Sequence, residues 1–264
     1  MSAQHSLAYR WLPDDTEESI LGADWHQDAI SSLRNGLRDV ARARRWPWHV
    51  GAQLTLVAWH PDGTVWRPKP DIMVHPHAGP TSREEMSATA DGLPALIIEV
   101  ASPSTYLSDV NISPPTTERR EAKGYEYLAW PLPEYLVFDP TGAYLPEQVR
   151  AWRVVEGQVQ EWTPDVAGRY QSRLLGVAFH PEGFFLRIFD PTGNPVPFDH
   201  EKADTIAEKA NTVARLEQER AEAIRRAEQV EQERIEAIRR AEQVEQENAA
   251  LRALLERLRG HDSG

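Results

Sequence analysis

The sequence predicts an α+β domain followed by a long, charged C-terminal helix. Two segments before Asp199 have helical character, and several short apolar runs bounded by Pro, Gly or Asp indicate strands. After Asp199 the composition becomes repetitive and rich in charge. We therefore expect a flexible leader over residues 1–17, a folded domain over 18–198 and a helical tail over 199–264.

The first half of the domain is expected to form one helix and three extended runs. The helix covers about residues 24–44, and its apolar face, with residues at steps of three and four, holds His26, Ile30, Leu33, Leu37 and Val40. Extended runs follow over 49–57, 67–75 and 96–100, with a loop-like segment over 76–94. The run over 96–100 is apolar except for Glu99, which is the pattern of a central strand covered on both faces.

The second half of the domain is expected to contain one helix and several hairpins. Residues 102–115 are polar and contain proline, which favours a loop, and residues 118–130 have helical character. Strands are expected over 135–138, 149–155 and 159–162, and a last hairpin pairs 174–179 with 183–190. We expect this half to serve packing.

Composition limits the class of protein. No apolar run approaches the roughly 18 residues that a membrane helix needs, and the N-terminus lacks the pattern of a secretory signal. We therefore expect a cytoplasmic protein with no membrane partner. The absence of cysteine excludes disulfides and leaves Asp, Glu and His as metal ligands.

The formal net charge is −12. From Glu201 onward there are 15 acidic and 12 basic residues, so the tail carries −3 and the rest −9. This balance argues against a general nucleic-acid coat but allows a local basic patch. The arginines of the first helix lie mainly off its apolar face and are either a solvated surface or a phosphate-facing patch; they are Arg34, Arg38, Arg42, Arg44 and Arg45.

The tail has the repeat of a coiled coil. Residues 217–230 recur as 231–244 with one difference, Ala221 against Ile235, and 14 residues are two heptads. With Val213 at position a, the d positions are Leu216, Ala223, Val230, Ala237, Val244, Leu251 and Leu258. Asn248 at a suits a polar layer that sets the register of a parallel dimer, whereas two arginines at a favour a solitary helix held by i,i+4 pairs. We expect a homodimer through residues 205–259.

Two carboxylates and a lysine are the candidates for chemistry. Asp71 opens one extended run, and Glu99 interrupts another that is otherwise apolar. On adjacent strands the two carboxylates would repel unless a divalent cation lay between them, and Mg²⁺ (or Mn²⁺) prefers oxygen ligands. Such a cation activates water, and Lys123 beside it would orient that water or stabilise charge on a phosphate.

Each of these residues also has a purely structural interpretation. Asp71 after a proline is a common turn cap, and Lys123 on an amphipathic helix is commonly solvated. His26 fits a histidine satisfied at the end of a core face, and Asp109 fits a loop cap. Asp139 before Pro140 fits a turn former.

The succession of motifs resembles a known family. PDIMV, LIIEVASPST, Asp109, Lys123 with Tyr127, and PEYLVFDP together are similar to the restriction endonucleases of the Uma-two type, in the PD-(D/E)XK nuclease superfamily. The resemblance covers roughly residues 18–195. It implies a restriction-endonuclease-like fold, a mixed sheet flanked by helices in the order α-β-β-β-α-β, and Mg²⁺-dependent hydrolysis of phosphodiester bonds.

The resemblance also implies roles for individual residues. Asp71 matches the motif aspartate and Glu99 the (D/E) position, both as metal ligands, with the Val100 carbonyl as a third. His26 and Asp109 are weaker candidates near the site. The superfamily pattern expects lysine two residues after the glutamate, but Ala101 stands there. The resemblance therefore implies that Lys123, on the following helix, is the matching lysine. An insert over 110–119 precedes it.

Two functions follow from these observations. The first is a metal-dependent endonuclease, with DNA favoured over RNA as the nucleic acid. The second is a catalytically weak or inactive nuclease-fold scaffold that acts in protein–protein interaction through the coiled-coil tail. The acidic domain and Ala101 favour this second function.

Overall fold

The structure is a computed structural model that describes residues 18–59, 63–115, 122–130 and 132–261. The expected leader over 1–17 and residues 116–121 of the expected insert lie outside these ranges. The chain divides into two units, one running up to Asp199 and the other from His200 onward.

The first unit contains three helices and twelve strands among the described residues. The helices are α1 (Glu18–Arg44), α2 (Tyr106–Asp109) and α3 (Lys123–Ala129). The strands are β1 (His49–Ala52), β2 (Thr55–Trp59), β3 (Val65–Trp66), β4 (Ile72–His75), β5 (Glu85–Ser87), β6 (Leu96–Val100), β7 (Glu134–Phe138), β8 (Val149–Val155), β9 (Gln158–Glu161), β10 (Tyr170–Gln171), β11 (Ala178–Glu182) and β12 (Phe185–Phe189).

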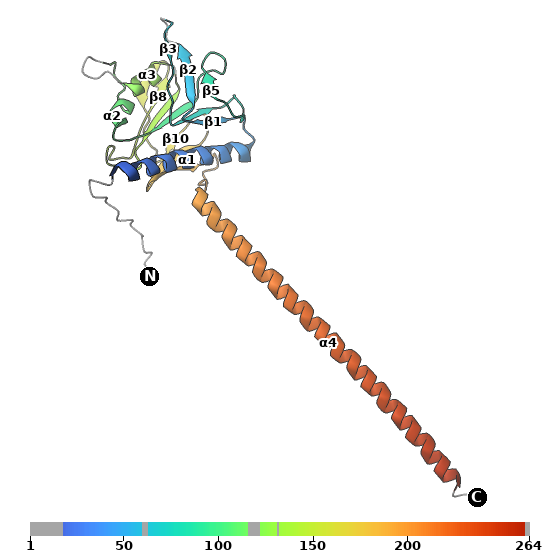
Figure 1. Cartoon of the computed structure of the whole chain (residues 1–264). Coiled ribbons are helices and arrows are strands. Elements are labelled where there is room, and N and C mark those ends of the chain that lie inside the picture. Colours follow the sequence, from blue (N-terminus) through green and yellow to red (C-terminus); the bar gives the residue numbers. More distant parts are fainter. Residues whose placement is uncertain (1–17, 60–62, 116–121, 131, 262–264) are drawn as a thin grey trace. The chain divides into compact units, whose positions relative to one another are not determined.

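A six-stranded mixed sheet forms the centre of this unit, in the order β1-β4-β6-β7-β8-β9. Strands β6 and β7 pair in parallel, and the other neighbours pair antiparallel. A parallel pair needs a crossover, and here it carries α2 and α3 (Figure 1). The expected α-β-β-β-α-β order is present in α1, β1, β4, β6, α3 and β7.

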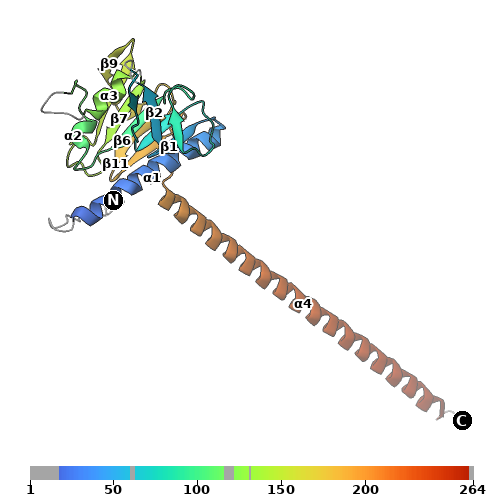
Figure 2. The same cartoon turned by 45° about the horizontal axis from the view of Figure 1, so that its top comes forward.

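The two faces of the sheet are covered by different elements (Figures 1 and 2). On one face, α1 and the small sheet β10-β11-β12 pack against apolar side chains that include Ile98 and Leu136. On the other face, α3 and strands β2 and β5 pack against a second set that includes Ile97 and Val137. Since successive residues of β6 point to opposite faces, Glu99 points toward the face that α3 covers.

The predicted hairpins of the second half are present. Strands β8 and β9 are joined by Glu156 and Gly157, which have φ of 51° and 75°. Positive φ at both residues is the type I′ geometry that matches the twist of a hairpin. Strands β11 and β12 pair over Ala178–Glu182 and Phe185–Phe189, so the expectation of a last hairpin is confirmed with its first strand starting later.

Three expectations about local structure are wrong. The run over 49–57 is two strands, because Gln53 adopts a φ of 50° that turns the chain from the main sheet into the small sheet β3-β2-β5. The expected loop over 102–115 contains the short helix α2. The first helix begins at Glu18, earlier than the expected residue 24.

The second unit is the helix α4 (Asp199–His261). Apolar side chains at the predicted d positions Leu216, Val230, Val244 and Leu251 are more than half exposed in the single chain. Among the described residues, no helix combines the length and the apolar character needed to cross a membrane.

Candidate active site

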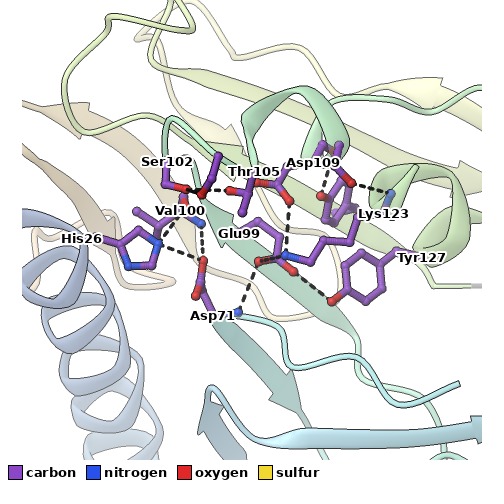
Figure 3. Close-up of polar contacts among 12 residues, drawn as sticks. His26, Asp71, Glu99, Val100, Ser102, Thr105, Asp109, Lys123 and Tyr127 are labelled. Atoms are coloured by element: carbon purple, nitrogen blue, oxygen red, sulfur yellow. Dashed lines mark hydrogen bonds and ion pairs between the residues drawn. The ribbon is translucent and has the colours of Figure 1, made fainter. Parts of the chain in front are cut away.

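The sheet register brings Asp71 and Glu99 together. Strands β4 and β6 pair Ile72 with Ile98 and Met73 with Ile97, so continuing this register places Asp71, which directly precedes β4, opposite Glu99. The Asp71 amide nitrogen lies 3.4 Å from Glu99 Oε2. The Val100 N–H donates to Asp71 Oδ2 at 2.9 Å. The two carboxylates singled out from the sequence therefore share one edge of the sheet (Figure 3).

Lys123 reaches this pair from the first turn of α3. Its Nζ lies 2.9 Å from Glu99 Oε2 and 3.2 Å from Asp109 Oδ1. Whatever the course of residues 116–121, the insert does not displace the lysine from the carboxylates. Ala101 is buried and has no amine to offer, so Lys123 is the ammonium that Glu99 contacts.

Gly124 is the residue that allows this approach. A Cβ atom at Gly124 would lie 2.5 Å from the backbone oxygen of Asp109 and 3.0 Å from that of Asn111. The first distance is too short for any side chain and the second is unusually tight, and neither oxygen belongs to a flexible group. The absence of a side chain at position 124 thus lets α3 lie against the end of α2, which sets the position of Lys123.

The two weaker candidates from the sequence both lie at the site. His26, from α1, has its Nε2 3.0 Å from the Val100 oxygen and 3.4 Å from Asp71 Oδ2. Asp109 is fully buried and its carboxylate pairs with Lys123, so its interpretation as a loop cap is wrong. By contrast, Asp139 is a turn former as expected, because its carboxylate accepts hydrogen bonds from backbone N–H groups of the turn that follows it.

Sequence reasoning assigned no role to Tyr127, which the structure places in the site. Its hydroxyl donates to Glu99 Oε1 at 2.8 Å, and the side chain is buried. The available signal was spacing, since Lys123 and Tyr127 are four residues apart and face the same side of a helix. Tyr135 on β7 fixes the backbone that carries the Asp109 carboxylate, because its hydroxyl donates to the Asp109 backbone oxygen at 2.8 Å.

Burial and crowding of negative charge dominate the electrostatics of Glu99. The pKa of Glu99 is raised to about 8, mainly by burial and also by the Asp71 and Asp109 carboxylates, while Lys123 opposes the shift. Burial lowers the pKa of Lys123, but Glu99 and Asp109 outweigh it and raise that pKa to about 12. The lysine therefore stays charged, and one ammonium does not neutralise the carboxylates around it.

The other site residues differ from Glu99. Burial would raise the pKa of Asp71, but hydrogen bonds from His26 and the Val100 N–H lower it below its usual value. The hydrogen bond to Asp71 raises the pKa of His26 against the effect of burial. Burial raises the pKa of Asp109 despite the nearby Lys123. Asp71 is therefore the carboxylate that stays ionised most readily.

The oxygen atoms at this edge fit a divalent cation. Within the ranges that the structure describes, no group of three or more His, Asp or Glu side chains is arranged to hold a metal ion. Mg²⁺, however, usually takes one or two carboxylates and completes its octahedron with water. Asp71, Glu99 and the Val100 carbonyl offer that set, and the crowding that raises the pKa of Glu99 is the charge a cation would offset.

The site opens beside Lys123. A cavity of about 320 Å³ is lined by residues of α2, α3 and the segment before β4, among them Trp66, Pro68, Asp109 and Lys123. The Lys123 side chain is 29% exposed, whereas the side chains of Glu99 and Asp109 are each 1% exposed. A group entering from solvent therefore meets the lysine before either of these carboxylates.

The fold and the site define a restriction-endonuclease-like domain. The model of the Uma2 family, described as "Putative restriction endonuclease", matches residues 7–182, which are 176 of the 264 residues. The chain belongs to the Uma2 family. A search of curated proteins found no match. The resemblance stated from the motifs and the expected fold class are both confirmed.

Replacing Gly124 with Ala is expected to lower the free energy of unfolding by about 1–3 kcal/mol, the usual cost of overpacking, because the backbone oxygen of Asp109 has to move. Urea denaturation of the purified chain measures this. Gly51→Ala is the matched control, since its Cβ would meet only the side chains of Leu54 and Met73. An equal or smaller loss at Gly124 than at Gly51 would contradict the close-approach argument.

The buried Glu99 carboxyl is expected to make stability fall as pH rises. Its pKa is about 8 in the fold against a usual 4.5, so between these values the folded state binds the extra proton. This contribution is full below about pH 4.5 and is lost as pH rises through about 8, at up to ~1.4 kcal/mol per pH unit. Urea unfolding of wild type and Glu99→Gln is compared across this pH window in EDTA. The difference between their free energies of unfolding should shrink as pH rises. A difference independent of pH would contradict the burial argument.

Proposed function

We propose that the domain is a metal-dependent endonuclease that hydrolyses phosphodiester bonds of DNA. The observation that carries this proposal is the convergence of Asp71, Glu99 and Asp109 with Lys123 at one edge of the main sheet. Membership in a family described as restriction endonucleases supports nucleic acid as the substrate class and favours DNA over RNA.

Asp71, Glu99 and the Val100 carbonyl would hold Mg²⁺ (or Mn²⁺). When bound, such an ion lowers the pKa of water and offsets charge on a phosphate. Tyr127 holds the Glu99 carboxylate through Oε1, which leaves Oε2 for the cation or for Lys123. The Val100 N–H holds Asp71 in the same way through Oδ2.

Lys123 would act on the phosphate or on the attacking water. Because its pKa is about 12, the ammonium is charged at neutral pH and can donate to an oxygen that gains negative charge. It is also the site residue that lines the cavity while touching Glu99. His26, with its contacts to the Val100 oxygen and Asp71, positions the ligands from α1.

Plasmid cleavage by the purified chain with Mg²⁺ or Mn²⁺ tests the proposal. Asp71→Asn, Glu99→Gln and Lys123→Met should each lower the cleavage rate by at least about 100-fold, as loss of a charge-stabilising group typically does. EDTA should abolish cleavage. Glu134→Gln is the matched control, because Glu134 is a buried glutamate of β7 that accepts hydrogen bonds from Ser172 and Arg173 outside the site. Undiminished cleavage by Asp71→Asn and Glu99→Gln would end the assignment.

We also propose that α4 forms a parallel dimer through residues 205–259. The exposed apolar side chains at the d positions form one stripe, and ion pairs within the helix lie beside it, such as Arg240 with Glu236 at 3.1 Å. Those pairs stabilise the helix but leave the stripe without cover. A second copy of the helix would bury it, with Asn248 setting the register.

Light scattering on the purified chain should give the mass of a dimer. Val230→Asp with Val244→Asp should shift it to a monomer, because both side chains lie at d positions and a buried carboxylate is costly. Ile235→Asp is the matched control, since residue 235 falls at position b and faces away from the stripe. A monomeric wild type, or equal effects of the two changes, would contradict the dimer.

A further inference from the structure

A second cavity, away from the site, has a basic and aromatic lining. Its volume is about 640 Å³. It lies between the C-terminal half of α1, the turn into β1 and the segment near Pro80. The side chains that matter are Arg34, Arg38, Arg42, Arg45, Trp46 and Trp48, and we call this cavity the arginine groove. Among the described residues, no Asp or Glu lines it.

The guanidinium groups of the arginine groove are poorly neutralised. Within the described ranges, Arg34 and Arg45 have no carboxylate partner, and the buried Nε of Arg34 has no hydrogen-bond partner. Arg38 donates to the Val50 oxygen at 3.0 Å, and Arg42 has one ion pair, with Asp39. Four arginines gathered in one groove of a chain with net charge −12 form a local basic patch that could hold an anion.

The aromatic side chains complete the lining. The indole rings of Trp46 and Trp48 lie 4.7 Å apart, and Trp46 is only partly buried. Arginine guanidinium groups match phosphate oxygens in pairs, and indole rings pack against sugars and bases. An isolated phosphate would use the arginines alone, whereas a nucleic-acid strand would use both kinds of side chain.

The arginine groove is connected to the candidate active site by two elements. Along β1 and β4, His49 pairs with His75 and Ala52 with Ile72, so Trp48 lies five residues along the ladder from Asp71, or about 17 Å. That span is roughly five phosphates of one DNA strand at about 3.4 Å each. Along α1, His26 lies in the N-terminal half of the helix, and Arg34, Arg38 and Arg42 follow at steps of four farther along the same helix.

We propose that the arginine groove binds the phosphate backbone of the DNA whose scissile phosphate lies at Asp71 and Glu99. This inference rests on the proposed function, since it assumes that DNA is the substrate. The groove supplies the cationic contact that the acidic site cannot make. It also sets which phosphate along the strand reaches Lys123.

The salt dependence of DNA binding tests the proposal. Fluorescence anisotropy with a labelled DNA duplex is measured for the full chain in EDTA, where cleavage does not occur. Each lost phosphate contact lowers the slope of log affinity against log salt by about 0.9, so Arg34→Gln, Arg42→Gln and Arg45→Gln together should lower it by about 2.7. At about 0.15 M salt the affinity should fall roughly 100-fold.

Two further variants separate charge from fold. Arg34→Lys, Arg42→Lys and Arg45→Lys together keep the charge and should keep the slope near that of wild type. Arg225→Gln, Arg226→Gln and Arg239→Gln remove the same charge from α4 and should leave the slope unchanged. The proposal that the groove binds DNA is contradicted if the Arg→Gln variant of the groove keeps the wild-type slope, or if the α4 variant loses as much slope as the groove variant. If the chain cleaves plasmid but the slope does not change, only the DNA-binding role of the groove is rejected. If the slope changes but no cleavage is seen, only the nuclease activity is rejected.

Discussion

The burial of one carboxyl group, that of Glu99, organises the candidate active site. A carboxyl group in the centre of a covered sheet is costly unless polar groups meet both of its oxygens. Tyr127 meets Oε1 and Lys123 meets Oε2, and both come from α3. The helix is therefore held over β6 by polar contacts as well as by apolar packing, and its close approach to α2 depends on Gly124. Loosening any of these contacts would leave a buried carboxyl group without its hydrogen-bond partners.

The topology explains why these residues meet where they do. The β6–β7 pair is the parallel pair of the main sheet, and its crossover starts at the C-terminal end of β6, directly after Glu99 and Val100. That crossover brings Asp109 and Lys123 back over the strand it has just left. The antiparallel β4 begins at the same edge, so Asp71 enters there as well. Open α/β sheets bind ligands outside the carboxyl ends of their strands, and the same edge holds the site here.

Much of the site could be predicted from the sequence, because its central features are local. A lone glutamate in an apolar run and an aspartate at the start of another suffice to suggest paired carboxylates on neighbouring strands. The burial of Asp109 could not be predicted, since it depends on α3 folding back across a segment that looked like a loop. The contact of Tyr127 with Glu99 could not be predicted either, because the spacing places Tyr127 beside Lys123 without showing what the two side chains contact. The break at Gln53 could not be predicted either. At this residue the chain passes from β1 in the main sheet to β2 in a second sheet, and a continuous run of β-forming residues does not indicate such a break.

The distribution of charge connects the site with the rest of the domain. Ionised carboxylates at this site repel a phosphate, and Lys123, already engaged with Glu99 and Asp109, neutralises only part of their charge. A nuclease built on this site would thus need a cation among the carboxylates to offset the negative charge that repels the phosphate. It would also need a basic surface elsewhere to bind the nucleic acid. Helix α1 reaches both regions, with His26 against Asp71 and the Val100 oxygen in its N-terminal half and the arginines of the groove in its C-terminal half. Trp48, which lines the arginine groove, lies about 17 Å along the ladder from Asp71. Among the described residues, no arginine of the groove pairs with the site carboxylates, so the groove would attract a strand without neutralising them.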